Sequence, residues 1–173
     1  AWAGGQVTAL DQSKRRLERL EETLERTGLS AGIVCANLLE WEPDEPAEAI
    51  LLDAPCSATG IFRRHPDVLH RVGNRQIAEM AEIQATLLDR AIDWLKPGGR
   101  LVYATCSLEP AEGEEQIDAL LTRRSDIRAV PVDPAVLPAG IAPASPGRVR
   151  TLPSMLAEQG GLDGFFIALL ERN

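Results

Sequence analysis

Short apolar runs alternate with amphipathic stretches along this chain. Strand-length runs occur at residues 6–10, 32–36, 49–53, 100–105 and 165–170. Leu17, Leu20 and Leu24 recur at helical spacing, and Gly28 follows as a stop, so a helix is predicted over residues 13–26. Two more helices are predicted over residues 76–95 and 112–123. This alternation is typical of an α/β fold with a parallel sheet that helices cover on both faces.

The segments between these elements differ in character. Residues 54–66 form a long loop of mostly small residues, and residues 96–99 read as a Lys-Pro-Gly-Gly turn. Residues 131–148 are dense in Pro, Gly and Ala, which predicts an irregular surface excursion.

Polar and reactive residues gather where the predicted strands end. Asp11, Asn37, Asp53 and Cys106 each lie at or just after the carboxyl end of a strand. Ligands of open parallel sheets bind beyond those ends, so the four residues are candidates for one site. Asp11 is placed to accept the hydroxyls of a ribose, and the alternative is that it caps the helix that follows.

Two cysteines stand at the ends of successive predicted strands. Cys56 lies in a loop framed by Pro55 and Gly60, and Cys106 follows the strand over residues 100–105. If those strands are neighbours, both thiols face one pocket. Small buried cysteines are common, but two at strand ends, each followed by Ser, favour a chemical function. Cys35 lies within a strand pattern and is expected in the core.

Composition narrows the class of protein. The 173 residues suffice for one domain, residues 1–173, and 45% of them are hydrophobic. No apolar run approaches a membrane span, no signal segment opens the chain, and three scattered cysteines do not form a disulfide framework. A cytoplasmic location is therefore expected. No CxxC pair occurs and there are two histidines, so no metal site is expected.

The charge is unevenly distributed. The formal net charge is −8, which argues weakly against nucleic-acid binding by the whole chain. Basic residues nevertheless crowd one short region that includes Arg63, Arg64 and His65. These three residues are candidates for lining an RNA path, and the alternative is a solvated loop.

Three motifs together resemble the Sun/RsmB-type RNA 5-methylcytosine methyltransferase family. The first runs from Asp53 to Gly60 and continues through Arg63-Arg64-His65-Pro66-Asp67. The second is Tyr103-Ala104-Thr105-Cys106-Ser107, with the later Glu114-Glu115-Gln116. The third is Asp163-Gly164-Phe165-Phe166. The resemblance extends over nearly the whole chain, and the paired cysteine motifs are highly specific.

This resemblance implies a reaction and roles for the site residues. The implied fold is a Rossmann-like class I methyltransferase sheet, and the implied cofactor is S-adenosyl-L-methionine. Cys106 would be the nucleophile that adds to cytosine C6, and Cys56 would assist release. Asp53 would bind the cytosine edge or the cofactor, and Asp11 and Asn37 would bind the cofactor. The sequence alone does not assign the two cysteine roles.

The chain departs from the family pattern in three places. The family usually has Asp at the position of Asn37 and Gly at that of Ala58, and we expect the second change to cost little. The chain also opens at Ala1 without an initiator Met. We expect truncation at the N-terminus, with the first sheet strand, its Gly-rich cofactor loop and an N-terminal RNA-binding domain missing. The missing strand would lie between those that end at Asp11 and Asp53, so the fragment alone should bind cofactor poorly and be inactive.

The leading hypothesis is therefore an RNA cytosine-5 methyltransferase that acts on ribosomal RNA. A transfer-RNA methyltransferase, a non-catalytic RNA-binding or assembly module derived from the enzyme, and a thiol redox protein are the alternatives.

Overall fold

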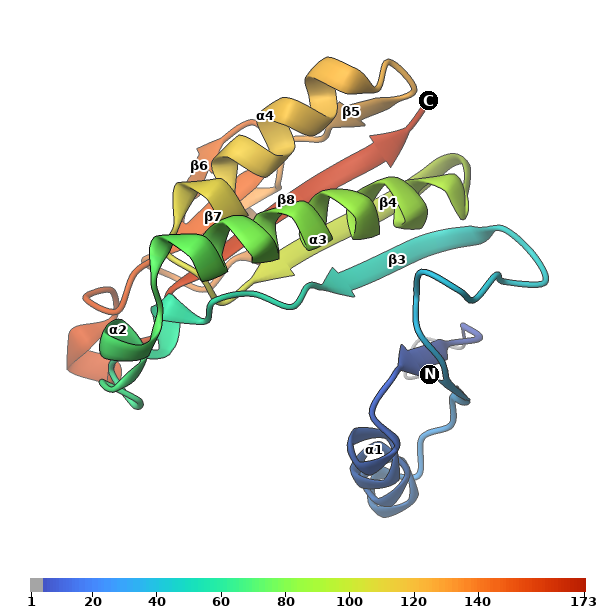
Figure 1. The fold of residues 1–173 in the computed structure, drawn as a ribbon, viewed down its shortest axis with the longest axis horizontal. Helices are drawn as coiled ribbons and strands as arrows, with labels where there is room; N and C mark the ends of the chain where they lie inside the picture. The colour runs from blue at the N-terminus through green and yellow to red at the C-terminus, as the bar shows by residue number, and fades with distance from the viewer. Residues whose placement is uncertain (1–4) are drawn as a thin grey trace. The chain divides into compact units, whose positions relative to one another are not determined.

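The computed structural model describes residues 5–173, which form two compact units, residues 5–44 and residues 45–173 (Figure 1). The expectation of one partial domain over residues 1–173 stays a prediction. The strands and helices lie close to the predicted ranges, with differences at several ends.

The first unit holds two parallel strands and one helix. Strand β1 (Thr8–Asp11) pairs with β2 (Gly32–Cys35), and helix α1 (Lys14–Thr27) connects them. The helix ends where predicted because Gly28 adopts a left-handed φ of 66°, and its N–H bonds the Glu25 carbonyl. Cys35 is exposed, so its predicted place in the core was wrong. Among the described residues β2 pairs with β1 alone, so the sheet of this unit has two strands and the other side of β2 has no strand partner there.

The second unit contains one mixed sheet with the order β3-β4-β8-β7-β6, and β5 pairs with β8. Its strands are β3 (Ala47–Asp53), β4 (Leu95–Thr105), β5 (Ile127–Ala129), β6 (Pro143–Ser145), β7 (Arg148–Thr151) and β8 (Phe165–Arg172). The pair β3–β4 is parallel, as predicted. The pairs that involve β5, β6, β7 and β8 are antiparallel, and β8 follows β7 through a connection without a long helix.

Two segments that were predicted as loops contain residues of β-strands. The turn at residues 96–99 is an excursion within β4: Ala47 pairs with Leu95, but Ala49 pairs with Arg100. Gly98 permits it with a φ of 77°. The excursion predicted over residues 131–148 includes β6 and the first residue of β7. These strands are three and four residues long, too short to give a recognisable alternation.

The long helices of the second unit, α3 (Asn74–Asp93) and α4 (Glu114–Arg123), lie on the same face of the sheet (Figure 1). The remaining helical segments are α2 (Val68–Arg71), η1 (Thr59–Ile61), η2 (Pro110–Glu112), η3 (Pro134–Val136) and η4 (Ala157–Gln159). The prediction that helices cover both faces of the sheet was therefore wrong for this unit. Its other face carries residues of the connection between β5 and β6, such as Leu137 and Ile141, and Leu51 of β3 is 72% exposed.

The core lies between these two helices and the sheet. Tyr103 and Phe166 are fully buried side chains of β4 and β8, with ring centroids 6.3 Å apart in an edge-to-face arrangement. Leu88 and Ile92 of α3 and Leu120 of α4 are completely buried. This packing fixes β4 and therefore the position at which Cys106 leaves the sheet.

Candidate functional site

The carboxyl ends of β3 and β4 bring the two predicted cysteines together. Asp53 ends β3, and Cys106 directly follows β4. The strands are parallel neighbours, so their ends meet at one edge of the sheet. The Sγ atoms of Cys56 and Cys106 lie 3.5 Å apart, and both thiols are free and partly exposed. Asp53 is exposed at the same edge.

The contact makes the two thiols unequal. A hydrogen bond from Cys56 lowers the pKa of Cys106 from its ordinary 9.0 to about 7, against the effect of burial and of Asp53. The same contact with Cys106, together with burial, raises the pKa of Cys56. Near neutral pH, Cys106 is therefore the thiol that ionises and Cys56 is the one that keeps its proton.

Alkylation as a function of pH tests this inequality. We expect the rate at which iodoacetamide alkylates Cys106 to rise with a midpoint near pH 7. In Cys56→Ala the midpoint should move up, because the thiolate loses its hydrogen-bond donor. Peptide mass analysis after timed quenching measures both profiles. An unchanged midpoint in Cys56→Ala would show that the sulfur contact does not set the pKa of Cys106.

The loop that carries Cys56 contains an unfavourable backbone conformation. Ala58 has a φ of 58°, in the left-handed region that favours glycine. The sequence suggested that Ala in place of the Gly usual in the family costs little stability. The structure indicates a larger cost, because a Cβ in this conformation destabilises the protein by about 1–2 kcal/mol.

Ala58→Gly should accordingly stabilise the protein. We expect the free energy of unfolding to rise by about 0.5–1 kcal/mol, since the greater entropy of an unfolded glycine offsets part of the relieved strain. Urea unfolding measures the change. Ala78→Gly, on the exposed side of α3, is the matched control and should cost about 1 kcal/mol. Destabilisation by both substitutions would contradict the strain.

The sequence analysis missed a buried carboxylate beside this pair. Glu112 was expected in the first turn of a helix, but it ends η2 and is fully buried. Its carboxylate accepts hydrogen bonds from Ser57 and Ser107, the residues that follow the two cysteines. The Ser after each Cys was the available signal, but no pattern in the sequence pairs those serines with Glu112.

The predicted basic residues lie in a loop held by the segment before β8. The Arg64 guanidinium donates to both carboxylate oxygens of Asp163, with Nε at 3.0 and 3.1 Å, and it lowers the pKa of that carboxyl against the effect of burial. Arg63 donates to the Leu162 carbonyl at 3.3 Å. Arg63, Arg64 and His65 thus lie near the third motif, and RNA contact by them stays a prediction.

The predicted cofactor residues of the first unit lie at one edge of its sheet. Asp11 Oδ1 accepts the Ser13 N–H at 2.7 Å and pairs with Arg16 at 2.8 Å. These bonds lower the pKa of Asp11, although burial opposes them. The alternative had predicted that Asp11 caps the helix, but the N-cap of α1 is Ser13, so Asp11 contacts the start of the helix without capping it. The Asn37 side chain accepts the Leu39 N–H at 3.1 Å and donates to Glu40.

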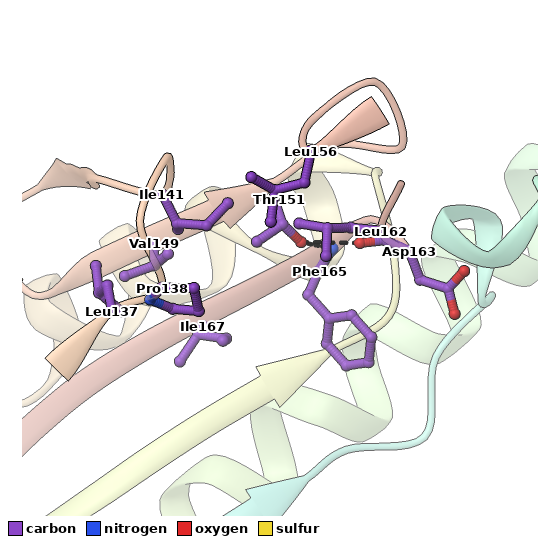
Figure 2. A pocket seen from close by; sticks show the side chains of 10 residues that line it. All are labelled: Leu137, Pro138, Ile141, Val149, Thr151, Leu156, Leu162, Asp163, Phe165 and Ile167. Atoms are coloured by element: carbon purple, nitrogen blue, oxygen red, sulfur yellow. Dashed lines mark hydrogen bonds between the residues drawn. The ribbon is translucent and has the colours of Figure 1, made fainter. Parts of the chain in front are cut away.

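A cavity of about 380 Å³ lies on the sheet face opposite α3 and α4 (Figure 2). Apolar side chains such as Leu137, Ile141 and Val149 line it, and neither Cys56 nor Cys106 is among its lining residues. The Asp163 carboxylate points away from this apolar cluster, and Thr151 ties the backbone there by bonds with Asp163 and Phe165. The cavity therefore lacks reactive groups of its own.

Within residues 5–173, no three His, Cys, Asp or Glu side chains gather closely enough to hold a metal ion. No helix there is both long and apolar enough to cross a membrane.

Solved structures with a similar fold include methyltransferases. NSun6 from Pyrococcus horikoshii, determined with SFG, matches 97% of this chain with a TM-score of 0.79 and 28% identity, and the match covers 41% of that chain. A methyltransferase homologue from the same organism matches 98% of this chain with a TM-score of 0.75 and 29% identity, over 54% of its own length. The fold is thus of the α/β class I methyltransferase type.

Proteins of similar sequence identify a narrower group than these solved structures do. Ribosomal RNA small subunit methyltransferase B of Vibrio cholerae is 42% identical over 170 residues, and the Klebsiella pneumoniae protein of that name is 45% identical over 168. The chain spans about 36% of the length of these relatives. The family model described as 16S rRNA methyltransferase RsmB/F matches residues 2–171. With two strand-end cysteines in contact and this match along nearly its whole length, the chain belongs to the RsmB/F family of 16S rRNA methyltransferases.

Proposed function

We propose that this chain is the catalytic part of an enzyme that transfers a methyl group from S-adenosylmethionine to C5 of a cytosine in ribosomal RNA, through a covalent bond between Cys106 and C6. The contact of Cys56 with Cys106, 3.5 Å between the sulfurs, carries the proposal. Family membership supports it, because the named relatives are small subunit rRNA methyltransferases. Those names also favour ribosomal over transfer RNA.

The reaction requires a nucleophile and a proton donor side by side. Cytosine C5 is a weak nucleophile, and addition of the Cys106 thiolate to C6 converts the ring to an enamine that is reactive at C5. Cys106 suits this step because its pKa lies near 7. After methylation, a solvent water acts as the base that takes the C5 proton, the C5–H electron pair re-forms the C5–C6 double bond, and the C6–S bond breaks to release Cys106 as a thiolate. A hydrogen bond from the Cys56 thiol stabilises the departing Cys106 thiolate, so Cys56 assists release.

The acceptor groups at the strand ends suit the cofactor chemically. S-adenosylmethionine supplies an electrophilic methyl group on a cationic sulfonium. Both bonds that Asp11 accepts among residues 5–173 use Oδ1, so Oδ2 is the oxygen that we assign to a ribose hydroxyl. We assign Asn37 to the adenine and the exposed carboxylate of Asp53 to the cofactor or the cytosine edge. The predicted Gly-rich loop would hold the methionine end.

The basic loop provides a test of RNA binding. We expect Arg63→Ala to weaken RNA binding and to reduce the slope of log K against log salt by about 0.7, the value for one phosphate contact on a single strand. Arg64→Ala should have a smaller effect, because Asp163 already neutralises Arg64. The exposed Arg128, paired with Glu171 at the opposite end of the sheet, is the control and should leave the slope unchanged. Filter binding at several salt concentrations measures all three. Equal slopes for Arg63→Ala and Arg128→Ala would remove the basic loop from the RNA path.

Methyl transfer tests the proposed function itself. The chain is joined at its N-terminus to the preceding region of a longer relative, since it spans about 36% of the length of such relatives, and this N-terminally extended protein is mixed with 16S rRNA and labelled S-adenosylmethionine. Nucleoside mass analysis should show label in 5-methylcytidine. Stable RNA binding without incorporation would favour the non-catalytic module, and incorporation into transfer RNA alone would change the substrate class.

A further inference from the structure

A single buried side chain connects the two cysteine loops. Glu112 Oε1 accepts hydrogen bonds from the Ser57 N–H at 2.9 Å and from Gln84 Nε2 at 3.1 Å, while Oε2 accepts the hydroxyls of Ser57 and Ser107. Those serines directly follow Cys56 and Cys106. One charged group therefore bonds both loops next to their reactive atoms, in a region without water exposure, where such bonds are strongest.

Neighbouring contacts hold Glu112 itself in place. Its backbone carbonyl accepts the Tyr103 hydroxyl at 2.9 Å and the Thr105 hydroxyl at 3.3 Å, so it is tied to the buried strand β4. Gln84 of α3 donates both to Glu112 and, at 2.8 Å, to the carbonyl of Pro55, which precedes Cys56. Through these hydrogen bonds the carboxylate fixes the residues beside the two thiols against the buried core.

The charge of Glu112 also acts on the pair. A fixed negative charge close to Cys56 disfavours a second negative charge there. After the hydrogen bond with Cys106 and the effect of burial, this repulsion adds to the rise in the pKa of Cys56. Geometry and charge thus favour the same arrangement, with the proton on Cys56.

We propose that Glu112 is a positioning residue for methyl transfer, which holds the two thiols at hydrogen-bond distance through Ser57 and Ser107 and directs nucleophilic attack to Cys106. The role of Glu112 in methyl transfer rests on the proposed function. The effect of Glu112 on the two thiols is independent of that function, because this effect requires neither RNA nor cofactor.

Competitive alkylation tests the effect on the thiols. The protein is treated with limiting iodoacetamide at pH 7, and the ratio of labelled Cys106 to labelled Cys56 is measured by peptide mass analysis. Glu112→Gln should lower that ratio about tenfold, equivalent to one pKa unit between the two sites. Glu115→Gln removes one charge from the exposed side of α4 and should leave the ratio unchanged. An unchanged ratio in folded Glu112→Gln would overturn the proposal.

Glu112→Gln is expected to fold. The amide oxygen can still accept from Ser57 N–H and Gln84, and the serine hydroxyls can rotate to accept from the amide nitrogen. Should it unfold, the double variant Ser57→Ala and Ser107→Ala removes both hydroxyl anchors and keeps the carboxylate. The proposal requires the labelling ratio to fall there too, and an unchanged ratio would refute it.

Methyl transfer separates this inference from the proposed function. In the N-terminally extended protein, Glu112→Gln should lower kcat about tenfold or more and leave the KM for RNA unchanged. If the unaltered protein transfers no methyl group but the labelling ratio shifts as expected, the proposed function fails and the effect of Glu112 on the thiols stands. If methyl transfer occurs and Glu112→Gln changes neither kcat nor the ratio, the positioning role fails alone.

Discussion

Cys56→Ala, mixed with RNA and S-adenosylmethionine, accumulates a covalent protein–RNA adduct that Cys106→Ala does not form. This is the expected result if Cys106 adds to C6 and Cys56 assists its expulsion. Without the Cys56 thiol, Cys106 still attacks but departs slowly. Cys106→Ala should lose methyl transfer by about 10⁴-fold or more, as is typical when a covalent nucleophile is removed.

Denaturing gel electrophoresis of the N-terminally extended protein with labelled RNA measures the adduct. Cys35→Ala is the control, because Cys35 is exposed in the first unit and is not part of the thiol pair. It should leave both the adduct and methyl transfer unchanged. An adduct in Cys106→Ala but not in Cys56→Ala would reverse the two roles, and equal yields would remove the assignment.

Gly60→Ala should disrupt the site without touching a reactive atom. A Cβ at Gly60 would lie 2.1 Å from the Gly164 carbonyl oxygen and 2.9 Å from that of Cys106. Both contacts are with backbone, so the chain must move, and Gly60 bonds both residues through its N–H and carbonyl. We expect a loss of about 3 kcal/mol and a fall in Tm on the order of 10 °C, with methyl transfer abolished.

Thermal unfolding measures this change against Gly73→Ala. A Cβ at Gly73 meets nothing within 4 Å, and its φ of −125° suits any residue. Because Gly73 is the N-cap of α3, the control should lose at most about 1 kcal/mol. Equal losses in the two variants would mean that the close approach at Gly60 relaxes easily.

The sequence predicted the parts of the fold and site that depend on local pattern. The runs that end at Asp53 and Thr105 are apolar and are followed by reactive residues, so the meeting of Cys56 and Cys106 followed from one assumption, that the strands are neighbours. The pairing of β3 with β4 confirms it. The resemblance to a methyltransferase family is likewise confirmed by the match over residues 2–171.

The features that the sequence did not predict depend on distant pairing or on backbone conformation. Nothing local indicates that Arg64 pairs with Asp163, which lies 99 positions later, or that Glu112 bonds Ser57. The cost at Ala58 depends on a φ angle that composition does not reveal. Cys35 is exposed because β2 pairs only with β1 among the described residues. The apolar pattern of the strand does not reveal how many neighbours it has.

The place of β8 in the sheet has a consequence for biosynthesis. β8 follows every other described strand in the chain, yet it lies between β4 and β7. A ribosome adds about 5–20 residues per second, so for several seconds the nascent chain holds both cysteines without the strand that completes the sheet around them. The Gly60–Gly164 contact also waits for that last segment. Translation thus delays completion of the sheet beside the thiol pair until β8 emerges.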